Sequence, residues 1–261
     1  MKKTWKKHLA ALLLAAPIGF ASASGGGHYE HVELNHGDQV SLQRGAQIFV
    51  NYCLSCHSAS AMRYNRLRDI GLSEDEIKKN LMFTTDKVGN VMQAHMSPAD
   101  AKKWFGAAPP DLTLIARSKG TDYLYAYLRG FYQDPTRPTG WNNVVFDKVG
   151  MPHALWEQQG IQAVKLDNKG MPVMKDDGHG GHVPDLYWVS TGSMTRMTKS
   201  GNVVTTEYDN YARDLVNFLS YMGEPAQLDH LSASTGLVSF SIGGNDAGFA
   251  QILTKCVTQL P

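Results

Sequence analysis

The feature that most constrains this chain is the pentapeptide Cys-Leu-Ser-Cys-His at residues 53–57. Two thiols three positions apart on a helix can each form a thioether with one of two vinyl groups on the same edge of a porphyrin. The imidazole of the next residue then points at the iron. This spacing is the attachment signature of c-type haem. The sequence therefore predicts one covalent haem c, attached through Cys53 and Cys56 and ligated by His57.

Three other uses of the two cysteines fit the sequence less well. A thioredoxin-like pair needs a strand–helix–strand context, whereas residues 41–52 have a helical pattern. A zinc site needs two further ligands at suitable spacing, and a disulfide between Cys53 and Cys56 would be strained. The third cysteine, Cys256, lies in a weakly patterned tail, and we expect it to be unmodified.

Residues 1–23 have the pattern of a cleaved export signal. Lysines at positions 2, 3, 6 and 7 precede an apolar stretch over 9–20, and Ala-Ser-Ala at 21–23 is a small-x-small cleavage site. The apolar stretch is shorter than the ~20 residues that a spanning helix needs. We therefore expect a mature chain that begins near Ser24 and works outside the cytoplasm, where c-type haem is attached in bacteria.

Charge and composition exclude two classes of protein. Because four lysines and no acidic residue fall in 1–23, the rest of the chain carries a net charge of −3, which argues against nucleic acid as a partner. Hydrophobic residues make up 43% of the chain and charged residues 19%, so the chain is not a disordered one.

Apolar spacing predicts a mainly α-helical domain over residues 24–225. One helical face runs into the pentapeptide through Leu42, Ala46, Phe49 and Cys53. Helix starts are expected at Ser73 with Glu76, at Ser97 before Pro98, at Thr121, and at Thr206 with Asp209. The last of these helices, over 206–222, should end at Gly223.

Residues 160–205 differ from the rest of this domain. Valines and other strand-forming residues alternate there with glycine-rich turns. We expect a small β-containing insertion. Residues 226–261 form a tail without a clear pattern.

The second axial ligand of the iron has two leading candidates, Met151 and Met171. Each stands in Gly-Met-Pro, where the proline stiffens the loop that presents the sulfur. Met151 has a slight lead because Met171 lies within the insertion, and His95 or His153 stays open as an alternative. A thioether ligand would raise the reduction potential relative to two histidines.

Several longer segments form a recognisable set. They are residues 41–47, 51–57 and 62–64, 108–112 with its Pro-Pro-Asp-Leu, 122–123 with 130–132, and 151–157, which begins Met-Pro-His. Together they resemble the cytochrome c1 family, the haem subunits of ubiquinol–cytochrome c reductase, in the form associated with β-proteobacteria. The similarity covers about residues 35–225.

The resemblance implies a role for individual residues. His57 would be the proximal ligand and Met151 the distal one. A carbonyl of Pro109 or Pro110 would accept the Nδ1–H of His57, and Arg117 is a candidate partner for a haem propionate. Gly45 would let the helix before the haem cross the 206–222 helix closely, opposite Tyr211 or Leu215.

The resemblance also implies a function, which is electron transfer by a subunit that is itself non-catalytic. Electrons would pass from a Rieske iron–sulfur protein to cytochrome c, with cytochrome b as a further partner, on the periplasmic side of the bacterial inner membrane. The family ends in a membrane-spanning helix, and residues 226–261 hold no stretch of that length and apolarity. The alternatives are a free-standing periplasmic carrier, a haem subunit of another respiratory complex, and a haem peroxidase.

Overall fold

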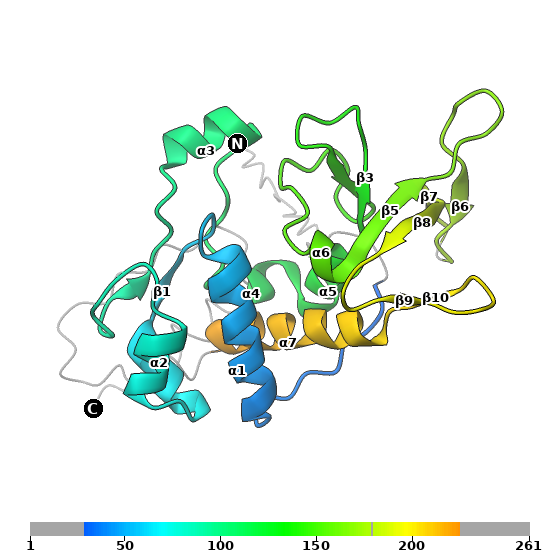
Figure 1. The fold of residues 1–261 in the computed structure, drawn as a ribbon. Helices are drawn as coiled ribbons and strands as arrows, with labels where there is room; N and C mark the ends of the chain where they lie inside the picture. The colour runs from blue at the N-terminus through cyan, green and yellow to red at the C-terminus, as the bar shows by residue number, and fades with distance from the viewer. Residues whose placement is uncertain (1–28, 179, 225–261) are drawn as a thin grey trace, which may run out of the picture.

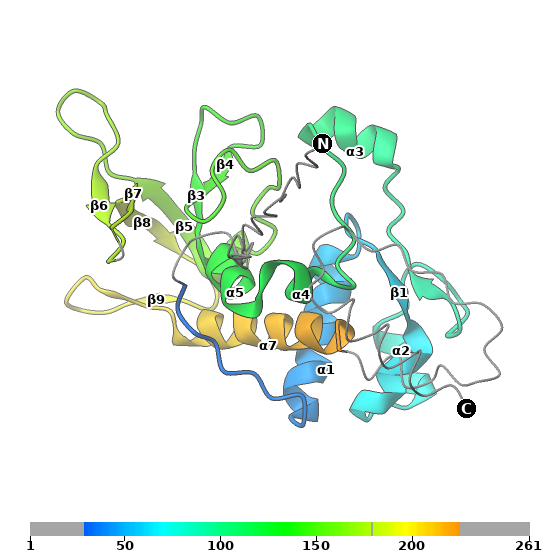
Figure 2. The same cartoon turned by 180° about the vertical axis from the view of Figure 1, so that it is seen from behind.

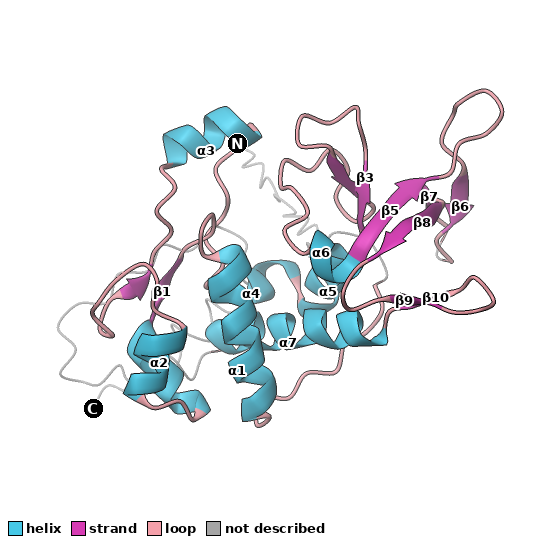
Figure 3. Cartoon of the chain, in the orientation of Figure 1, coloured by secondary structure: helices cyan, strands magenta, loops and turns pink. Residues whose placement is uncertain are grey.

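The computed structural model describes residues 29–178 and 180–224 (Figure 1). Helices gather around two long ones, α1 (Gln39–Ile48) and α7 (Thr206–Met222), which cross each other. Most of the strands lie at the other end of the molecule, and α3 (Pro98–Phe105) stands apart from the helical cluster (Figure 3). The fold is thus a helical domain with small sheets.

The two crossing helices build most of the core. Leu42, Ala46 and Phe49 are buried on the α1 side. On α7, Tyr211 is half-buried, and the buried apolar residues include Tyr208, Leu215, Phe218, Leu219 and Met222. Two shorter helices, α4 (Ile115–Lys119) and α5 (Thr121–Arg129), also pack against α7 (Figure 2). A single hydrophobic cluster therefore joins segments from both ends of the described chain.

Gly45 lies where α1 meets α7. A Cβ atom at this position would be 2.1 Å from the carbonyl oxygen of Asp214 and 2.6 Å from Cβ of Phe218. The close crossing predicted for Gly45 is present, but Tyr211 and Leu215 are not the residues opposite it. The ridge of Asp214 and Phe218 faces α1 instead.

Polar contacts explain why α7 is rotated about its axis so that Asp214 faces α1. The Asp214 carboxylate is 3% exposed and accepts hydrogen bonds from Oγ of Ser41 at 2.7 Å and Nε of Arg44 at 2.5 Å. Nδ2 of Asn217 donates to the same Ser41 oxygen at 3.0 Å. A buried carboxylate is costly unless it is paired, so α7 turns Asp214 toward the donors on α1.

Two predicted helix starts are confirmed. Helix α2 (Glu74–Asn80) begins with the complete capping box of Ser73 and Glu76. Ser97 caps α3, which has Pro98 in its first turn and ends at Gly106, as the sequence indicated. Each of these two signals is contained within four consecutive residues, so local chemistry alone determines where the helix begins.

Two other helix starts are displaced by one residue. Helix α5 is preceded by Gly120, whose φ of +87° turns the chain between α4 and α5, and Thr121 is the first helical residue rather than the cap. Helix α7 is preceded by Thr205, and the Thr205 hydroxyl donates to the Asp209 carboxylate at 2.7 Å. The expected capping box of Thr206 is therefore wrong.

The strands form one four-stranded sheet and several two-stranded ribbons. The sheet has the order β4-β3-β5-β8, from β3 (Phe131–Gln133), β4 (Trp141–Asn143), β5 (Gly160–Val164) and β8 (Leu186–Thr191). Strands β3 and β5 are parallel neighbours, so residues 134–159 form a crossover that contains β4 and α6 (Trp156–Gln159).

The remaining ribbons are antiparallel pairs. Two lie within the segment predicted to hold strands and pair β6 (Met174–Asp176) with β7 (His182–Pro184), and β9 (Arg196–Met197) with β10 (Val203–Val204). The third ribbon pairs β1 (Ala59–Arg63) with β2 (Val91–Met92). A 3-10 helix, η2 (Tyr64–Ile70), directly follows β1 in the chain. Strands β3 and β4 lie before the expected insertion, yet they share a sheet with it.

Some predictions concern residues beyond those that the structure describes. The signal at 1–23, the tail at 226–261 and Cys256 all lie there. Among residues 29–178 and 180–224, no helix has the length and apolarity needed to cross a membrane.

The α1–α7 crossing leads to a stability prediction for Gly45→Ala. Alanine in the middle of an exposed helix stabilises it by about 1 kcal/mol relative to glycine. Here the added methyl group meets backbone atoms that cannot move away, and overpacking of this kind costs about 1–3 kcal/mol. We expect a net fall of about 1–2 kcal/mol in the free energy of unfolding, measured with urea on the complete protein.

Gly89→Ala is the matched control for this experiment. Gly89 has nothing within 4 Å of the position that a Cβ would take. The urea midpoint of the Gly89→Ala variant should equal that of the unmodified protein within experimental error. Equal midpoints for both variants would contradict the close crossing.

Candidate functional site

The pentapeptide at 53–57 lies at the end of α1, where the helix widens. Residues Phe49–Cys53 form a π-helical turn (η1), closed by a 2.9 Å hydrogen bond from Leu54 N to the Phe49 carbonyl oxygen. The amides of Cys56 and His57 then both donate to the carbonyl of Cys53, at 3.0 and 2.8 Å. The backbone of the motif is therefore fixed by its own hydrogen bonds.

Both thiols of the motif are available for covalent attachment. Within the described residues, neither Cys53 nor Cys56 is in a disulfide, and both are half-buried. Burial, and then the neighbouring Cys56, raise the pKa of the Cys53 thiol to about 12. Cysteines of redox pairs and reactive nucleophiles have lowered pKa values instead, so this environment does not suit a thioredoxin-like site.

The His57 ring is held in one orientation. Its Nδ1 atom lies 2.8 Å from the carbonyl oxygen of Pro110, and the side chain is 8% exposed. Because a carbonyl only accepts, Nδ1 carries the proton and Nε2 keeps its lone pair. Burial lowers the pKa of His57 against the opposing effect of this hydrogen bond. A neutral imidazole with a free Nε2 and a fixed Nδ1–H is the form that binds iron.

The Pro110 carbonyl is itself positioned by the residue after it. The Asp111 carboxylate accepts hydrogen bonds from the amides of Ser60 and Thr113, both at 2.8 Å. Burial opposes its charge, but these hydrogen bonds hold the pKa of Asp111 below its usual value. The Leu112 amide also donates to the Ser58 carbonyl. The Pro-Pro-Asp-Leu loop is thus tied to the segment that directly follows His57.

Met151 is half-buried on the crossover between β3 and β5. The Tyr127 hydroxyl donates to its sulfur at 3.5 Å. Gly150 lies against α3, because a Cβ there would be 2.6 Å from the Phe105 carbonyl oxygen. Farther along the same crossover, Nε2 of Gln158 donates to the hydroxyl of Tyr52 at 2.8 Å, next to Cys53. The crossover is therefore connected to the pentapeptide.

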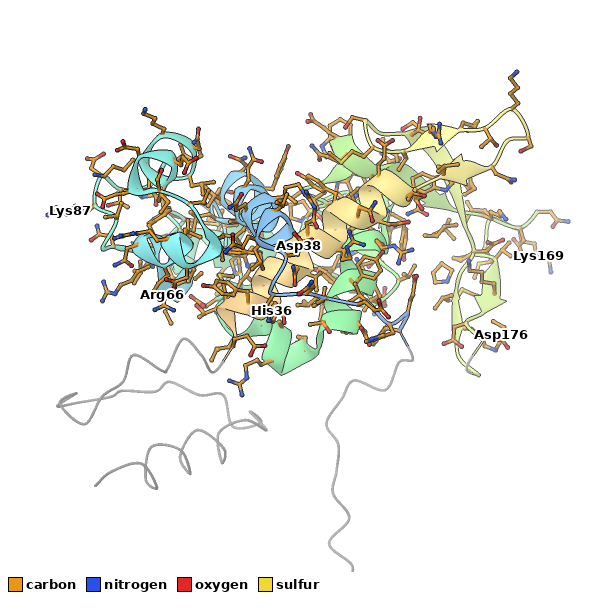
Figure 4. The ribbon with its side chains drawn as sticks, turned by 90° about the horizontal axis from the view of Figure 1, so that it is seen from below. His36, Asp38, Arg66, Lys87, Lys169 and Asp176 are labelled. Atoms are coloured by element: carbon orange, nitrogen blue, oxygen red, sulfur yellow. The ribbon has the colours of Figure 1, made fainter. Side chains whose placement is uncertain are left out.

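The other candidate ligands have different surroundings. Met171 is 60% exposed in the turn before β6. Lys169, in the same turn, lies at the end of the molecule opposite Arg66, which belongs to η2 (Figure 4). His95 is exposed.

His153 is 3% exposed and enclosed by aromatic rings. It stacks on Phe131 with centroids 4.7 Å apart and meets Trp141 edge-on at 5.2 Å. Burial lowers the pKa of His153 to about 4. Its Nε2 has no hydrogen-bond partner in the described part of the chain. The ring packs within the aromatic cluster and keeps the loop after Met151 in place.

Arg117 lies on α4 beside the end of α7. Its Nη1 atom donates to the carbonyl of Gly223 at 3.4 Å, which is a long hydrogen bond. Across residues 29–178 and 180–224, no carboxylate is within ion-pair distance of it. The guanidinium therefore has donors left for an anionic group.

Three features of this site were missed by the sequence reasoning. They are the π-helical turn, the contact of Tyr127 with the Met151 sulfur, and the contact of Gln158 with Tyr52. The signal for Tyr127 was its four-residue spacing from Tyr123 and Phe131, which is typical of any buried helix face. Nothing in the sequence marked the other two.

The donor set fits a covalently attached haem. Two thiols lie three positions apart, a neutral imidazole follows the second one directly, and a half-buried thioether is held on a loop that is connected to the motif. This set matches the His/Met ligation of c-type cytochromes, and it differs from the four nitrogen or sulfur ligands of a structural zinc site.

Comparison with known proteins agrees with this geometry. Residues 29–168 match the model of the Cytochrome C1 family. Cytochrome c1 of Allochromatium vinosum is 44% identical over 222 residues, which cover 85% of each chain. Cytochrome c1 of Rhodospirillum rubrum is 30% identical, over 83% of this chain and 84% of the relative. The ammonia monooxygenase gamma subunit of Nitrosomonas europaea is 42% identical, over 84% and 83%. The chain belongs to the cytochrome c1 family.

Proposed function

We propose that this chain carries one haem c, attached through Cys53 and Cys56, with His57 and Met151 as axial ligands. In this proposal it is the haem subunit of a ubiquinol–cytochrome c reductase. It would pass electrons from a Rieske iron–sulfur protein to a cytochrome c, on the periplasmic side of the inner membrane. The 2.8 Å contact between His57 Nδ1 and the Pro110 carbonyl carries the proposal.

That contact matters because it selects one tautomer of His57. A histidine that binds iron commonly donates its other N–H to a carbonyl or carboxylate, which orients the ring and makes the ligand more basic. Pro110 supplies that acceptor from a loop that Asp111 holds in place. A histidine with only a packing role would not need its Nδ1–H fixed and its Nε2 left open.

The choice between the two Gly-Met-Pro loops rests on exposure and attachment. Met151 is half-buried and its loop is connected to Tyr52 through Gln158, whereas Met171 is 60% exposed in a turn outside the helical domain. A ligand that shields iron from water must come from a loop that is fixed relative to the motif. These observations support Met151.

Ligation of the iron by both His57 and Met151 would favour electron transfer over catalysis. The haem would supply a one-electron carrier, and His57 and Met151 would leave no position open for oxygen or peroxide. Arg117, with unused donors, would hold a propionate through a charge-assisted hydrogen bond.

One comparison favours a second candidate function. The Nitrosomonas europaea relative named as an ammonia monooxygenase gamma subunit is about as similar as the cytochrome c1 of Allochromatium vinosum. A haem subunit of another complex would use the same attachment site. Co-purification with a b-type cytochrome and a Rieske protein supports the reductase, and recovery as a monomer from the periplasm supports a free carrier. Tight binding of carbon monoxide to the ferrous protein would point to a peroxidase.

Replacement of the axial methionine tests the ligation. Met151→Leu should lower the midpoint potential and abolish the sulfur–iron absorption band near the red end of the visible spectrum, because leucine has no donor atom. Met171→Leu is the matched control, since it makes the same change in the same tripeptide, and it should leave both unchanged. The opposite pattern would assign the ligand to Met171.

Replacement of the cysteines tests covalent attachment. Haem should migrate with the chain on a denaturing gel stained for haem peroxidase activity, and Cys53→Ser with Cys56→Ser should abolish that signal. Cys256→Ser is the control and should retain it. Running membrane and soluble fractions side by side reports where the protein resides. A haem-free band from cells with a working attachment system would refute the proposal.

A further inference from the structure

We propose that Tyr127 is a positioning residue for the iron ligand, and that its hydroxyl sets the reduction potential by donating a hydrogen bond to the Met151 sulfur. The inference rests on the proposed role of Met151 as axial ligand. It extends that role to a residue on a different element, α5, which the sequence reasoning did not single out.

The direction of the hydrogen bond follows from the chemistry of the two groups. The Tyr127 oxygen and the Met151 sulfur are 3.5 Å apart. A thioether has no hydrogen to give, so the hydroxyl is the donor. The sulfur has two lone pairs, and the contact with Tyr127 uses one of them. The other is left for a metal ion.

Tyr127 is held firmly enough to act as a fixed donor. Its ring stacks on Tyr123 at 6.0 Å and meets Phe131 edge-on at 5.2 Å. Its carbonyl accepts a 2.8 Å hydrogen bond from Asn143, which links this turn of α5 to β4. Within residues 29–178 and 180–224, the hydroxyl makes no other hydrogen bond. Burial raises the pKa of Tyr127 above its ordinary value, so the hydroxyl keeps its proton.

The loop that carries the sulfur is fixed from the other side. Gly150 packs against the Phe105 carbonyl, and His153 stacks on Phe131 with an interplanar angle of 3°. Phe131 thus contacts both the Tyr127 ring and the His153 ring. Tyr127 and the loop that carries the sulfur are therefore both packed against the same aromatic ring.

A hydrogen bond to a ligating sulfur withdraws electron density from it. The sulfur then donates less to the iron, which destabilises the electron-poor ferric form relative to the ferrous form. Hydrogen bonding around a ligand is one of the means by which a protein tunes a redox centre. Loss of the hydroxyl should therefore lower the midpoint potential, even when the ring and its packing are kept.

The test compares Tyr127→Phe with Tyr125→Phe in the haem-loaded protein. Tyr125 lies on α5 as well and is buried, but its ring lies under the Arg129 guanidinium at 4.5 Å. Tyr127→Phe should show a lower midpoint potential than the wild type and Tyr125→Phe, and should keep a sulfur–iron band at a shifted wavelength. Equal potentials for the two variants would overturn the inference.

A second substitution guards against a folding defect in Tyr127→Phe. Incorporation of 3-fluorotyrosine at position 127 keeps the ring and makes the hydroxyl a stronger donor. The midpoint potential should then rise, opposite to the effect of phenylalanine. An unchanged or lower potential would overturn the inference.

Failure of this inference is distinguishable from failure of the proposed ligation. If Met151→Leu retains the sulfur–iron band, Met151 is not the ligand and both proposals fall. If Met151→Leu loses the band while both changes at position 127 match Tyr125→Phe, the ligation stands and only the role of Tyr127 falls.

Discussion

The close crossing of α1 and α7 at Gly45 is the contact on which the other features depend. With no side chain at position 45, the backbone of α1 reaches the Asp214 carbonyl, and the buried Asp214 carboxylate meets its donors on α1. This crossing fixes the end of α1, where the π-helical turn and the pentapeptide follow. The position of His57 relative to the rest of the core is therefore set by helix packing.

Local chemistry explains which parts of the fold could be predicted from the sequence. The capping box of Ser73 with Glu76 and the Ser97 start need only neighbouring residues, and both are present. The prediction that Tyr211 or Leu215 lies opposite Gly45 was wrong, because the rotation of α7 about its axis depends on where the Asp214 carboxylate finds hydrogen-bond donors. Strands β3 and β4 have three residues each, too few to show an alternating pattern; they pair with each other, and β3 also pairs with β5.

In the candidate site, too, some features are determined by neighbouring residues and others by how distant segments pack. The spacing of Cys53, Cys56 and His57 is local, and the chemistry it implies can be read without a structure. The two Gly-Met-Pro tripeptides are identical in sequence, and Met151 was favoured there because Met171 lies within the insertion and because of the family resemblance. The fold adds that Met151 is half-buried and accepts a hydrogen bond from Tyr127, whereas Met171 is 60% exposed. The hydrogen bond from Tyr127 to Met151 joins two residues that are 24 positions apart in the sequence. Such a contact depends on how α5 and the crossover pack.

The crossover between β3 and β5 has a consequence for how this family can vary. Its two ends are anchored in adjacent parallel strands, paired at Gln133 and Ala163. The entropy of closing such a loop grows only with the logarithm of its length, so doubling the length costs roughly 0.6 kcal/mol. Residues can therefore be gained or lost in the turns of this crossover outside β4 at little thermodynamic expense, while the sheet keeps the segment that follows in register.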